Sequence, residues 1–277
     1  MLHLVRLIAA IAVVIFCTFF PFLPGRYESL AIPLSVMAQI VGKVGLLLVP
    51  VGVIWLVVEL SSRQPTKRYV LGVVALVVWS VVWLCVSVGA LVSSGFALAV
   101  VTAALGIFIV ISLWRRLRVV RGAVPGRDIA VPLSLVAGPV AVLAIQFAFG
   151  DRAAESSRSR AIRNSAQLIA DIEQYRVRHS QYPSSLWSVW EDHQPGVIGI
   201  DRYHYEPSGD SFNLIFEQTS LVFGTREFVV YNPRDEQGMT SHNMDRLRVS
   251  PDQLRRGRGY YAALNAAQPH WKIFLFD

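Results

Sequence analysis

Long apolar runs separated by short polar or charged loops fill the first 150 residues. A helix needs about 20 apolar residues to cross roughly 30 Å of hydrocarbon. By this criterion the pattern predicts five membrane-spanning helices, at residues 4–23, 44–60, 69–92, 96–114 and 129–149.

The second apolar run is too long for one untilted span, because it begins at residue 30 and contains Gln39 and Lys43. We interpret residues 30–42 as a helical lead-in at the membrane interface, although a spanning role also fits the pattern. Pro50 predicts a kink, because proline removes a helical hydrogen bond. Thr102 and Gly106 form one of several small-xxx-small pairs, which favour close packing of membrane helices.

An excess of positive over negative charge occurs only in alternate loops. Cytoplasmic loops of membrane proteins are enriched in lysine and arginine. The loop near residues 93–95 is uncharged, and the first loop balances Arg26 with Glu28. The distribution therefore predicts a cytoplasmic N-terminus and an extracytoplasmic segment 151–277. The basic loop residues are Arg63, Lys67, Arg68, Arg115, Arg116, Arg118, Arg121 and Arg127.

The pattern changes after residue 150. Residues 152–178 repeat apolar positions at helical spacing, with Leu168 and Ile172 on one face and Arg163 and Gln167 on the other. This helix has no break from the fifth span except Gly150. Beyond it, apolar and polar residues alternate at 203–206 and 212–217 around the turn sequence 207–210, and two further strands are predicted at 227–231 and 271–276. An α+β domain, a long helix on an antiparallel sheet, is the predicted fold.

Composition agrees with a membrane protein that carries a polar domain. Hydrophobic residues make up 53% of the 277 residues and charged residues only 16%. The formal net charge of +7 divides into +8 for residues 1–150 and −1 for residues 151–277. The excess of positive charge thus lies in the predicted membrane-spanning residues 1–150, so we expect no nucleic-acid partner. Cys17 and Cys85 both lie in apolar runs, which excludes a disulfide framework in the domain.

One stretch resembles a known family. Residues 161–186 read AIRNSAQLIADIEQYRVRHSQYPSSL, and YHYEPSGDSFNLIFE follows at 203–217. This stretch is similar to the globular part of type IV pilins and type II secretion pseudopilins, where a helix ends in a tyrosine before Tyr-Pro and a small sheet. It looks closer still to bacterial multi-pass envelope proteins of unknown function that carry this module. The resemblance implies a pilin-like domain outside the cytoplasm, with Tyr175, Tyr182 and Pro183 in helix–sheet packing.

The sequence departs from the pilin pattern in the membrane. Pilins have one membrane helix, with a cleavable leader and a glutamate at the fifth mature position. Here four spans precede the fifth, which begins with Ile129-Ala130-Val131 and has no such glutamate. We therefore expect only the domain fold to be shared, without pilin processing or polymerisation.

Candidate chemistry is sparse. No GxSxG, HExxH, GxxxxGK[ST] or GxGxxG motif occurs. Five residues of types that occur in metal or acid–base sites lie close in sequence without recognisable ligand spacing. We interpret His204 and Glu206 as a polar sheet face, Ser184 and Ser185 as helix-start residues, and expect no catalytic, metal or cofactor site. The five residues are Asp192, His193, Asp201, His204 and Glu206.

Lys43 and Glu59, at the two ends of the second predicted span, are the ionisable residues that we consider for a role inside the membrane. Such residues are functional candidates, but both lie near predicted span ends, where snorkelling to the interface explains them more simply. A basic cluster near the C-terminus is either a solvated loop, the reading we favour, or a contact for anionic lipid or an acidic partner. Its members are Arg246, Arg248, Arg255, Arg256 and Arg258.

Together these features predict a non-enzymatic protein of the bacterial cytoplasmic (inner) membrane that presents a pilin-like interaction or assembly domain. Its expected partners are the lipid bilayer and either another envelope protein or a second copy bound through the spans. The alternative is a subunit of a membrane transport or envelope enzyme complex whose active partner lies elsewhere.

Overall fold

The computed structural model describes residues 2–61, 65–120, 129–189, 194–208, 210–222, 225–237 and 262–276. The chain forms two compact units. The helical unit comprises residues 1–20 and 30–150, and the sheet unit comprises residues 21–29 and 151–277. The segment 21–29 therefore belongs with the C-terminal residues, although in sequence it lies between the first two apolar runs.

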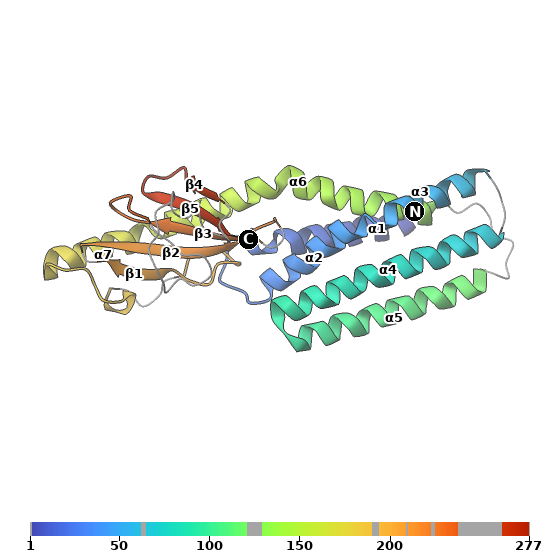
Figure 1. Ribbon diagram of the computed structural model, residues 1–277, viewed down its shortest axis with the longest axis horizontal. Coiled ribbons are helices and arrows are strands. Elements are labelled where there is room, and N and C mark those ends of the chain that lie inside the picture. Colours follow the sequence, from blue (N-terminus) through green and yellow to red (C-terminus); the bar gives the residue numbers. More distant parts are fainter. Residues whose placement is uncertain are drawn as a thin grey trace. The chain divides into compact units, whose positions relative to one another are not determined.

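The helical unit contains the apolar stretches expected from the sequence (Figure 1). Among the described residues, four helices are long and apolar enough to cross a membrane, and a bent helix pair makes a fifth candidate. Its helices are α1 (Leu2–Phe19), followed by the 3₁₀ turn η1 (Phe20–Phe22), α2 (Ala31–Gly45), α3 (Leu48–Ser61), α4 (Pro65–Ser94), α5 (Phe96–Val120) and the first part of α6 (Ala130–Asn164).

The bent pair is formed by α2 and α3, which meet at an angle of 45°. Pro50 lies in the first turn of α3, where its missing N–H costs no intrahelical hydrogen bond. The helix therefore breaks one turn before the proline, at Leu46 and Leu47, and the predicted kink is confirmed. Helix α2, which covers most of the predicted lead-in, buries much of its length within the protein, including Ala31.

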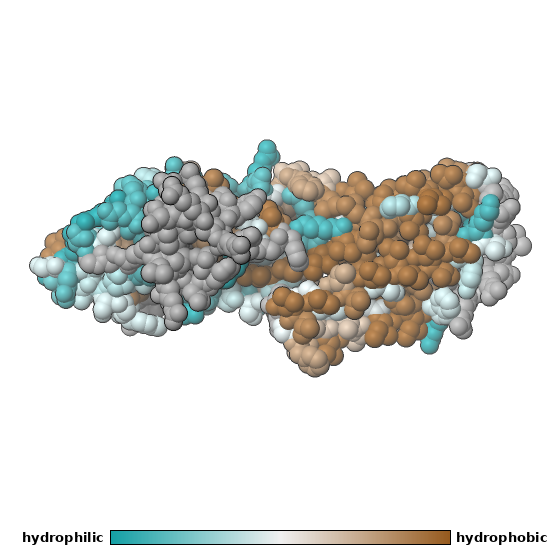
Figure 2. Space-filling view, in the orientation of Figure 1, coloured by the Kyte–Doolittle hydropathy of each residue, from teal (hydrophilic) through white to brown (hydrophobic). Residues whose placement is uncertain are grey.

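The surface of the helical unit is largely apolar, as the brown areas of Figure 2 show. Phe108 of α5 is 67% exposed and Leu84 of α4 is 64% exposed. Apolar side chains on the outside, with backbone hydrogen bonds satisfied within helices, are typical of a protein dissolved in lipid.

Close packing of α4 on α5 depends on Gly106. A Cβ atom at Gly106 would lie 1.6 Å from Cδ1 of Trp83, so the indole ring occupies the space that a side chain would fill. The indole Nε1 of Trp83 donates a hydrogen bond to the carbonyl oxygen of Thr102, 2.5 Å away. The predicted Thr102–Gly106 pair thus mediates helix packing within the chain.

The sheet unit packs helices on a five-stranded antiparallel sheet of strand order β1-β2-β3-β5-β4. As expected, α6 continues without a break beyond Gly150, and a one-residue interruption at Ser165 separates it from the next helix. Strand β4 is an element that the alternation pattern did not reveal. The elements are α7 (Ala166–His179), the 3₁₀ turn η2 (Leu186–Ser188), β1 (His204–Ser208), β2 (Ser211–Thr219), β3 (Arg226–Tyr231), β4 (Ala262–Asn265) and β5 (Trp271–Phe276).

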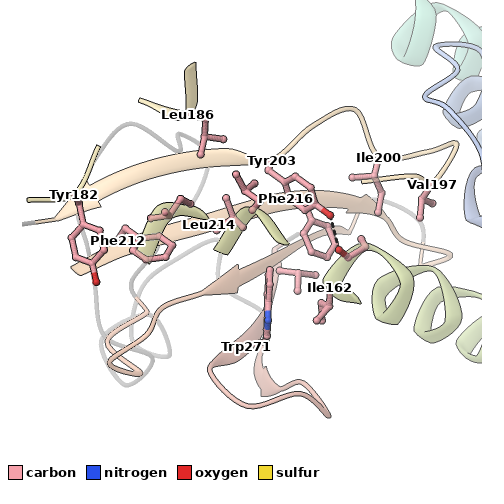
Figure 3. Close-up of a cluster of buried hydrophobic side chains, with 14 residues drawn as sticks. Ile162, Tyr182, Leu186, Val197, Ile200, Tyr203, Phe212, Leu214, Phe216 and Trp271 are labelled. Carbon is pink, nitrogen blue, oxygen red and sulfur yellow. Dashed lines mark hydrogen bonds between the residues drawn. The ribbon is translucent and has the colours of Figure 1, made fainter. Parts of the chain in front are cut away.

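The buried face of the amphipathic helix is the predicted one. Leu168 and Ile172 of α7 are completely buried, whereas Arg163 and Gln167 are exposed. Figure 3 shows the core that these helices share with one face of the sheet, including Phe212, Leu214 and Phe216 of β2. The alternating strand residues predicted from the sequence therefore do form the principal core.

The opposite face of the sheet carries the polar residues His204 and Glu206, as expected, but it also carries a second buried apolar cluster that the sequence pattern did not predict. Ile215 of β2 shares a second buried cluster with Phe228, Val230, Phe274 and Phe276. All residues of β2 from Ser211 to Phe216 are buried. On this face His204 and Glu206 of β1 pair with Ile215 and Asn213 of β2. Asn213 is buried and accepts a hydrogen bond from Asn232 over 2.9 Å.

Candidate functional sites

The segment after α1 is joined to the sheet unit by main-chain hydrogen bonds. Pro24 forms an antiparallel bridge with Val197. The amide of Ile198 donates to the carbonyl of Leu23 (3.0 Å), and the amide of Gly25 donates to the carbonyl of Gly196 (3.1 Å). Further bonds run from the amide of Gly199 to Pro21 (2.8 Å) and from that of Glu28 to Ile198 (3.0 Å).

Glycines make this close approach possible. A Cβ atom at Gly199 would lie 2.5 Å from Cβ and 2.7 Å from the carbonyl oxygen of Pro21. Gly196 has φ +71°, a left-handed conformation that favours glycine, and packs on the amide of Asn164. That amide donates a hydrogen bond to the carbonyl of Pro195 over 2.7 Å. The contacts between residues 21–29 and 196–199, which we call the junction, therefore connect the segment 21–29 to the end of α6. No local sequence pattern predicts this connection.

The Tyr182-Pro183 sequence follows the C-terminal end of α7. Tyr182 and Pro183 are buried as expected. The Tyr182 hydroxyl donates to Glu173 (3.0 Å) and accepts from Arg176 (2.8 Å), and its ring meets Phe212 edge-on at 5.1 Å. Burial and the neighbouring Glu173 carboxylate raise the pKa of Tyr182. These contacts fix the chain where it turns from the helix toward the sheet.

Tyr175 does not take the core position that we expected. Its ring is half-buried and stacks on His179, with ring centroids 4.0 Å apart. After Leu168 and Ile172, the next position at four-residue spacing is Arg176, which turns toward Tyr182. Tyr175 therefore lies beside the buried stripe of the helix, and Tyr182 supplies the aromatic ring to the core instead.

A buried ionic cluster joins α6 to β2 and β3. Nε of Arg158 lies 2.8 Å from Oε1 of Glu227, and both side chains are almost fully buried. Arg158 also pairs with Glu155. Ser157 donates to Oε1 of Gln218 (3.0 Å), whose amide nitrogen bonds the carbonyl of Ala154 (3.0 Å) and Glu227 (3.4 Å). The cluster fixes how α6 lies on the sheet.

Burial raises the pKa of Glu227, and the hydrogen bond and charge of Arg158 oppose that rise. Glu155 adds to the rise through like-charge repulsion. A buried ion pair costs desolvation energy, which its attraction only partly repays, whereas loss of one partner leaves an uncompensated charge. This cluster could not be predicted from helical or strand periodicity, because Arg158 and Glu227 lie 69 residues apart in the sequence. Arginine and glutamate are also residue types that usually lie on the protein surface.

The helical unit contains a polar stripe that is buried at Ser35 and Gln39 and half-buried at Lys43. Ser35, Gln39 and Lys43 follow one another at four-residue spacing along α2. Lys43 donates to Gln39 (3.4 Å), Gln39 donates to Ser35 (3.4 Å), and Ser35 donates to the carbonyl of Thr18 in α1 (2.7 Å). Gln146 of α6 donates to the hydroxyl of Thr18 (3.2 Å). The four-residue repeat was visible in the sequence, but its partners on α1 and α6 were not.

Glu59 and Lys43 both make polar contacts with other residues of the helical unit. Glu59 of α3 is buried, and its Oε2 lies 2.8 Å from Nε of the buried Arg68 in α4. Lys43 lies in the last turn of α2 and donates a hydrogen bond to Gln39 of the same helix over 3.4 Å. Both residues therefore take part in polar contacts within the helical unit.

The other predicted residues are only partly placed. Asp192, His193 and the cluster Arg246, Arg248, Arg255, Arg256 and Arg258 lie outside the described residues. Asp201 is exposed beside Arg202, with 3.2 Å between Oδ2 and Nε. His204 and Glu206 are half-buried in β1 and share one face of the sheet. Where the chain is described, no three His, Cys, Asp or Glu side chains come together as metal ligands would.

Comparisons of the chain with protein-family models, with curated proteins and with solved structures found no match.

Proposed function

We propose that this chain is a multi-pass protein of the bacterial cytoplasmic membrane, with its N-terminus in the cytoplasm and its sheet unit outside. The five crossings are α1, the α2–α3 pair, α4, α5 and the first part of α6. Their length and apolar composition support this topology. The basic loops give the orientation, because Lys and Arg are enriched on the cytoplasmic side.

The pairing of residues 21–29 with residues 196–199 carries this proposal. Segments that share main-chain hydrogen bonds lie on the same side of a membrane. An even number of crossings must therefore separate residue 29 from residue 151. One crossing by α2–α3, together with α4, α5 and α6, meets this condition, whereas a re-entrant α2–α3 pair or two separate crossings would violate it.

We propose that the sheet unit is a pilin-like, non-enzymatic module for interaction or assembly. A helix on an antiparallel sheet, with the Tyr182-Pro183 turn at its end, supports this assignment. The module is joined to the helical unit by three stretches of chain, at both ends of segment 21–29 and at α6. Such attachment suits a domain that is presented at the membrane. Its partner is another envelope protein or a second copy, and it uses no cofactor.

A second candidate is a subunit of a membrane transport or envelope enzyme complex. The polar stripe of Ser35, Gln39 and Lys43 favours it, because polar and ionisable residues inside spans are costly and often mark functional paths.

Topology is tested with single cysteines in a Cys17→Ser, Cys85→Ser background. In intact cells a membrane-impermeant maleimide should label Tyr27→Cys and Gln174→Cys, whereas Lys67→Cys should react only after permeabilisation. A C-terminal phosphatase fusion should be active. Labelling of Lys67→Cys in intact cells would contradict the proposed orientation. Labelling of only one of Tyr27→Cys and Gln174→Cys in intact cells would contradict the pairing of residues 21–29 with residues 196–199.

The interaction function is tested in the full chain, since residues 21–29 belong to the sheet unit. A photo-crosslinking amino acid replaces Val177 of α7, which is 82% exposed, and Val101 of α5, which is 62% exposed, serves as the matched position. A discrete protein adduct at position 177 supports the interaction module. Adducts confined to position 101 favour the complex subunit, and lipid adducts alone at both positions argue against a protein partner.

A further inference from the structure

The outer side of α6 and α7 in the sheet unit carries a row of arginines. Both helices bury apolar side chains in the same core, among them Ile162 of α6 and Leu168 of α7. At about 3.6 residues per turn, the members of the row in α6 lie within about 80° of one another, on the side away from Ala161 and Ile162. The members are exposed except Arg160, which is half-buried. We call this set the arginine row, and it comprises Arg152, Arg160, Arg163 and Arg178.

The arginine row differs in its contacts from the other arginines described between residues 151 and 277. Four of those others pair with carboxylates, and a fifth donates a hydrogen bond to the Tyr182 hydroxyl. Where the chain is described, no side chain of the row forms an ion pair or a hydrogen bond. Its charges are therefore available to a partner from outside the chain. The four paired arginines are Arg158, Arg202, Arg226 and Arg234, and the fifth is Arg176.

Few acidic side chains oppose the arginine row. Helices α6 and α7 contain three acids after residue 151, and two of them have other partners. Glu155 pairs with Arg158, and Glu173 accepts a hydrogen bond from the Tyr182 hydroxyl. The third, Asp171, accepts an exposed hydrogen bond from the amide of Gln167 over 2.9 Å. The outer side of the two helices is therefore positive, although residues 151–277 carry a formal net charge of −1.

The side chains between the arginines are polar. Ser156, Gln167 and Gln174 are all exposed, and from residue 152 to residue 176 no large hydrophobic side chain is exposed. Protein interfaces usually bury an apolar centre rich in aromatic residues. Helices that lie on a membrane place large apolar side chains in the lipid beside their basic residues. The arginine row has neither feature, and its like charges oppose pairing with the same row of a second copy, so it suits a ligand recognised by negative charge.

We propose that the arginine row binds a linear anionic polymer of the cell envelope whose repeating units carry phosphate groups. The planar guanidinium group presents two parallel N–H donors, which match two oxygens of a phosphate. About 16 Å of helix separates Arg152 from Arg163, and about 22 Å more leads to Arg178, so an extended polymer reaches the whole row and a single small anion does not. This inference goes beyond the proposed protein partner, and it rests on the proposed placement of the sheet unit outside the cytoplasm.

The test measures binding of a fluorescently labelled inorganic polyphosphate chain to the full-length protein in an uncharged detergent. Fluorescence anisotropy gives the dissociation constant at several salt concentrations. Replacement of all four row arginines by glutamine should weaken binding about tenfold or more and reduce its salt dependence, because each lost phosphate contact releases fewer counterions. The matched control removes the same charge elsewhere in the chain and should weaken binding less than about threefold. It replaces Arg246, Arg248, Arg255 and Arg258 by glutamine.

Asp171→Asn removes the acid beside the arginine row and should tighten polyphosphate binding. The unfolding temperature of each variant shows whether it is folded, and if the fourfold variant is not, the single charge reversal Arg163→Glu decides. Equal losses in the fourfold variant and its matched control, or no polyphosphate binding by the wild type, would overturn the proposal.

Vesicles that contain phosphatidylglycerol separate a polymer from lipid phosphate as the ligand. We expect polyphosphate bound to the protein to resist competition by these vesicles, and vesicle binding of equal strength that is lost in the fourfold variant would assign the row to membrane lipid instead. Because binding is measured on purified protein, its outcome is independent of the orientation in the membrane, which the maleimide experiment tests separately.

Discussion

The amide of Gly199 donates a hydrogen bond to the carbonyl oxygen of Pro21 over 2.8 Å, which ties the chain after α1 to the sheet unit. This contact needs a residue without a side chain, because a Cβ atom would lie 2.7 Å from the same oxygen. Residues 21–29 are therefore an integral part of the sheet unit, and residues 151–277 alone lack the segment that pairs with residues 196–199.

Gly199→Ala should open this junction. Overpacking of this kind typically costs about 1–3 kcal/mol, because the backbone must move to admit the new methyl group. Thermal unfolding of the full chain should occur at a lower temperature, and Tyr27→Cys should react faster with maleimide. Gly138→Ala is the matched control, since its Cβ would meet only Leu7 at 3.7 Å. Equal behaviour of the two variants would show that the junction contributes nothing.

Leu168→Ala should destabilise the sheet unit by about 2–5 kcal/mol, because the side chain is fully buried between helix and sheet. Gln167→Ala removes only an exposed hydrogen bond to Asp171 and should cost less than about 0.5 kcal/mol. Chemical denaturation followed by fluorescence of the full chain compares the two. A similar midpoint for both variants would mean that the assigned helix face is wrong.

Tyr182→Ala should cost much more stability than Tyr175→Ala. Truncation of a buried aromatic typically costs about 3–5 kcal/mol, and Tyr182 also loses its bonds to Glu173 and Arg176. Tyr175 loses only its stacking on His179. Hydrogen exchange of α7 and β2 amides measures the difference. Faster exchange of these amides in Tyr175→Ala than in Tyr182→Ala would support the core position that the sequence pattern suggested for Tyr175.

Glu227 should make the stability of the sheet unit depend on pH. Because burial raises its pKa above the ordinary value of 4.5, the folded state holds the proton more tightly than the unfolded state. The contribution of this group is therefore complete below pH 4.5 and is lost as pH rises through the folded-state pKa. Glu227→Gln removes the titration, so its stability should fall less over this range than that of the wild type.

Denaturant midpoints between pH 4 and pH 7 check this prediction. Asp171→Asn supplies the control, since it also neutralises an acid but on the exposed side of α7, within hydrogen-bonding distance of Gln167. Parallel pH profiles of the wild type and Glu227→Gln would rule out Glu227 as the source.

Local patterns were sufficient to predict most elements. Runs of about 20 apolar residues and helical or strand periodicity depend only on neighbouring positions, so the apolar helices, the buried stripe of α7 and strands β1, β2, β3 and β5 were all accessible. Pro50 also predicted the broken helix, because its missing N–H acts within one turn. Strand β4 has the sequence Ala-Ala-Leu-Asn, with too little contrast between alternate residues to be recognised.

The sequence by itself determined which segments are apolar helices and which residues build the main core, because side-chain periodicity records the faces that a helix or strand buries. Only the tertiary structure decided that residues 21–29 join the sheet unit, that Glu59 pairs with Arg68, and that Arg158 meets Glu227 in a buried cluster. Each of these depends on a contact between different elements. The sequence pattern around a polar residue is the same whether its side chain faces water or a buried partner. Only the packing of one element against another supplies that partner.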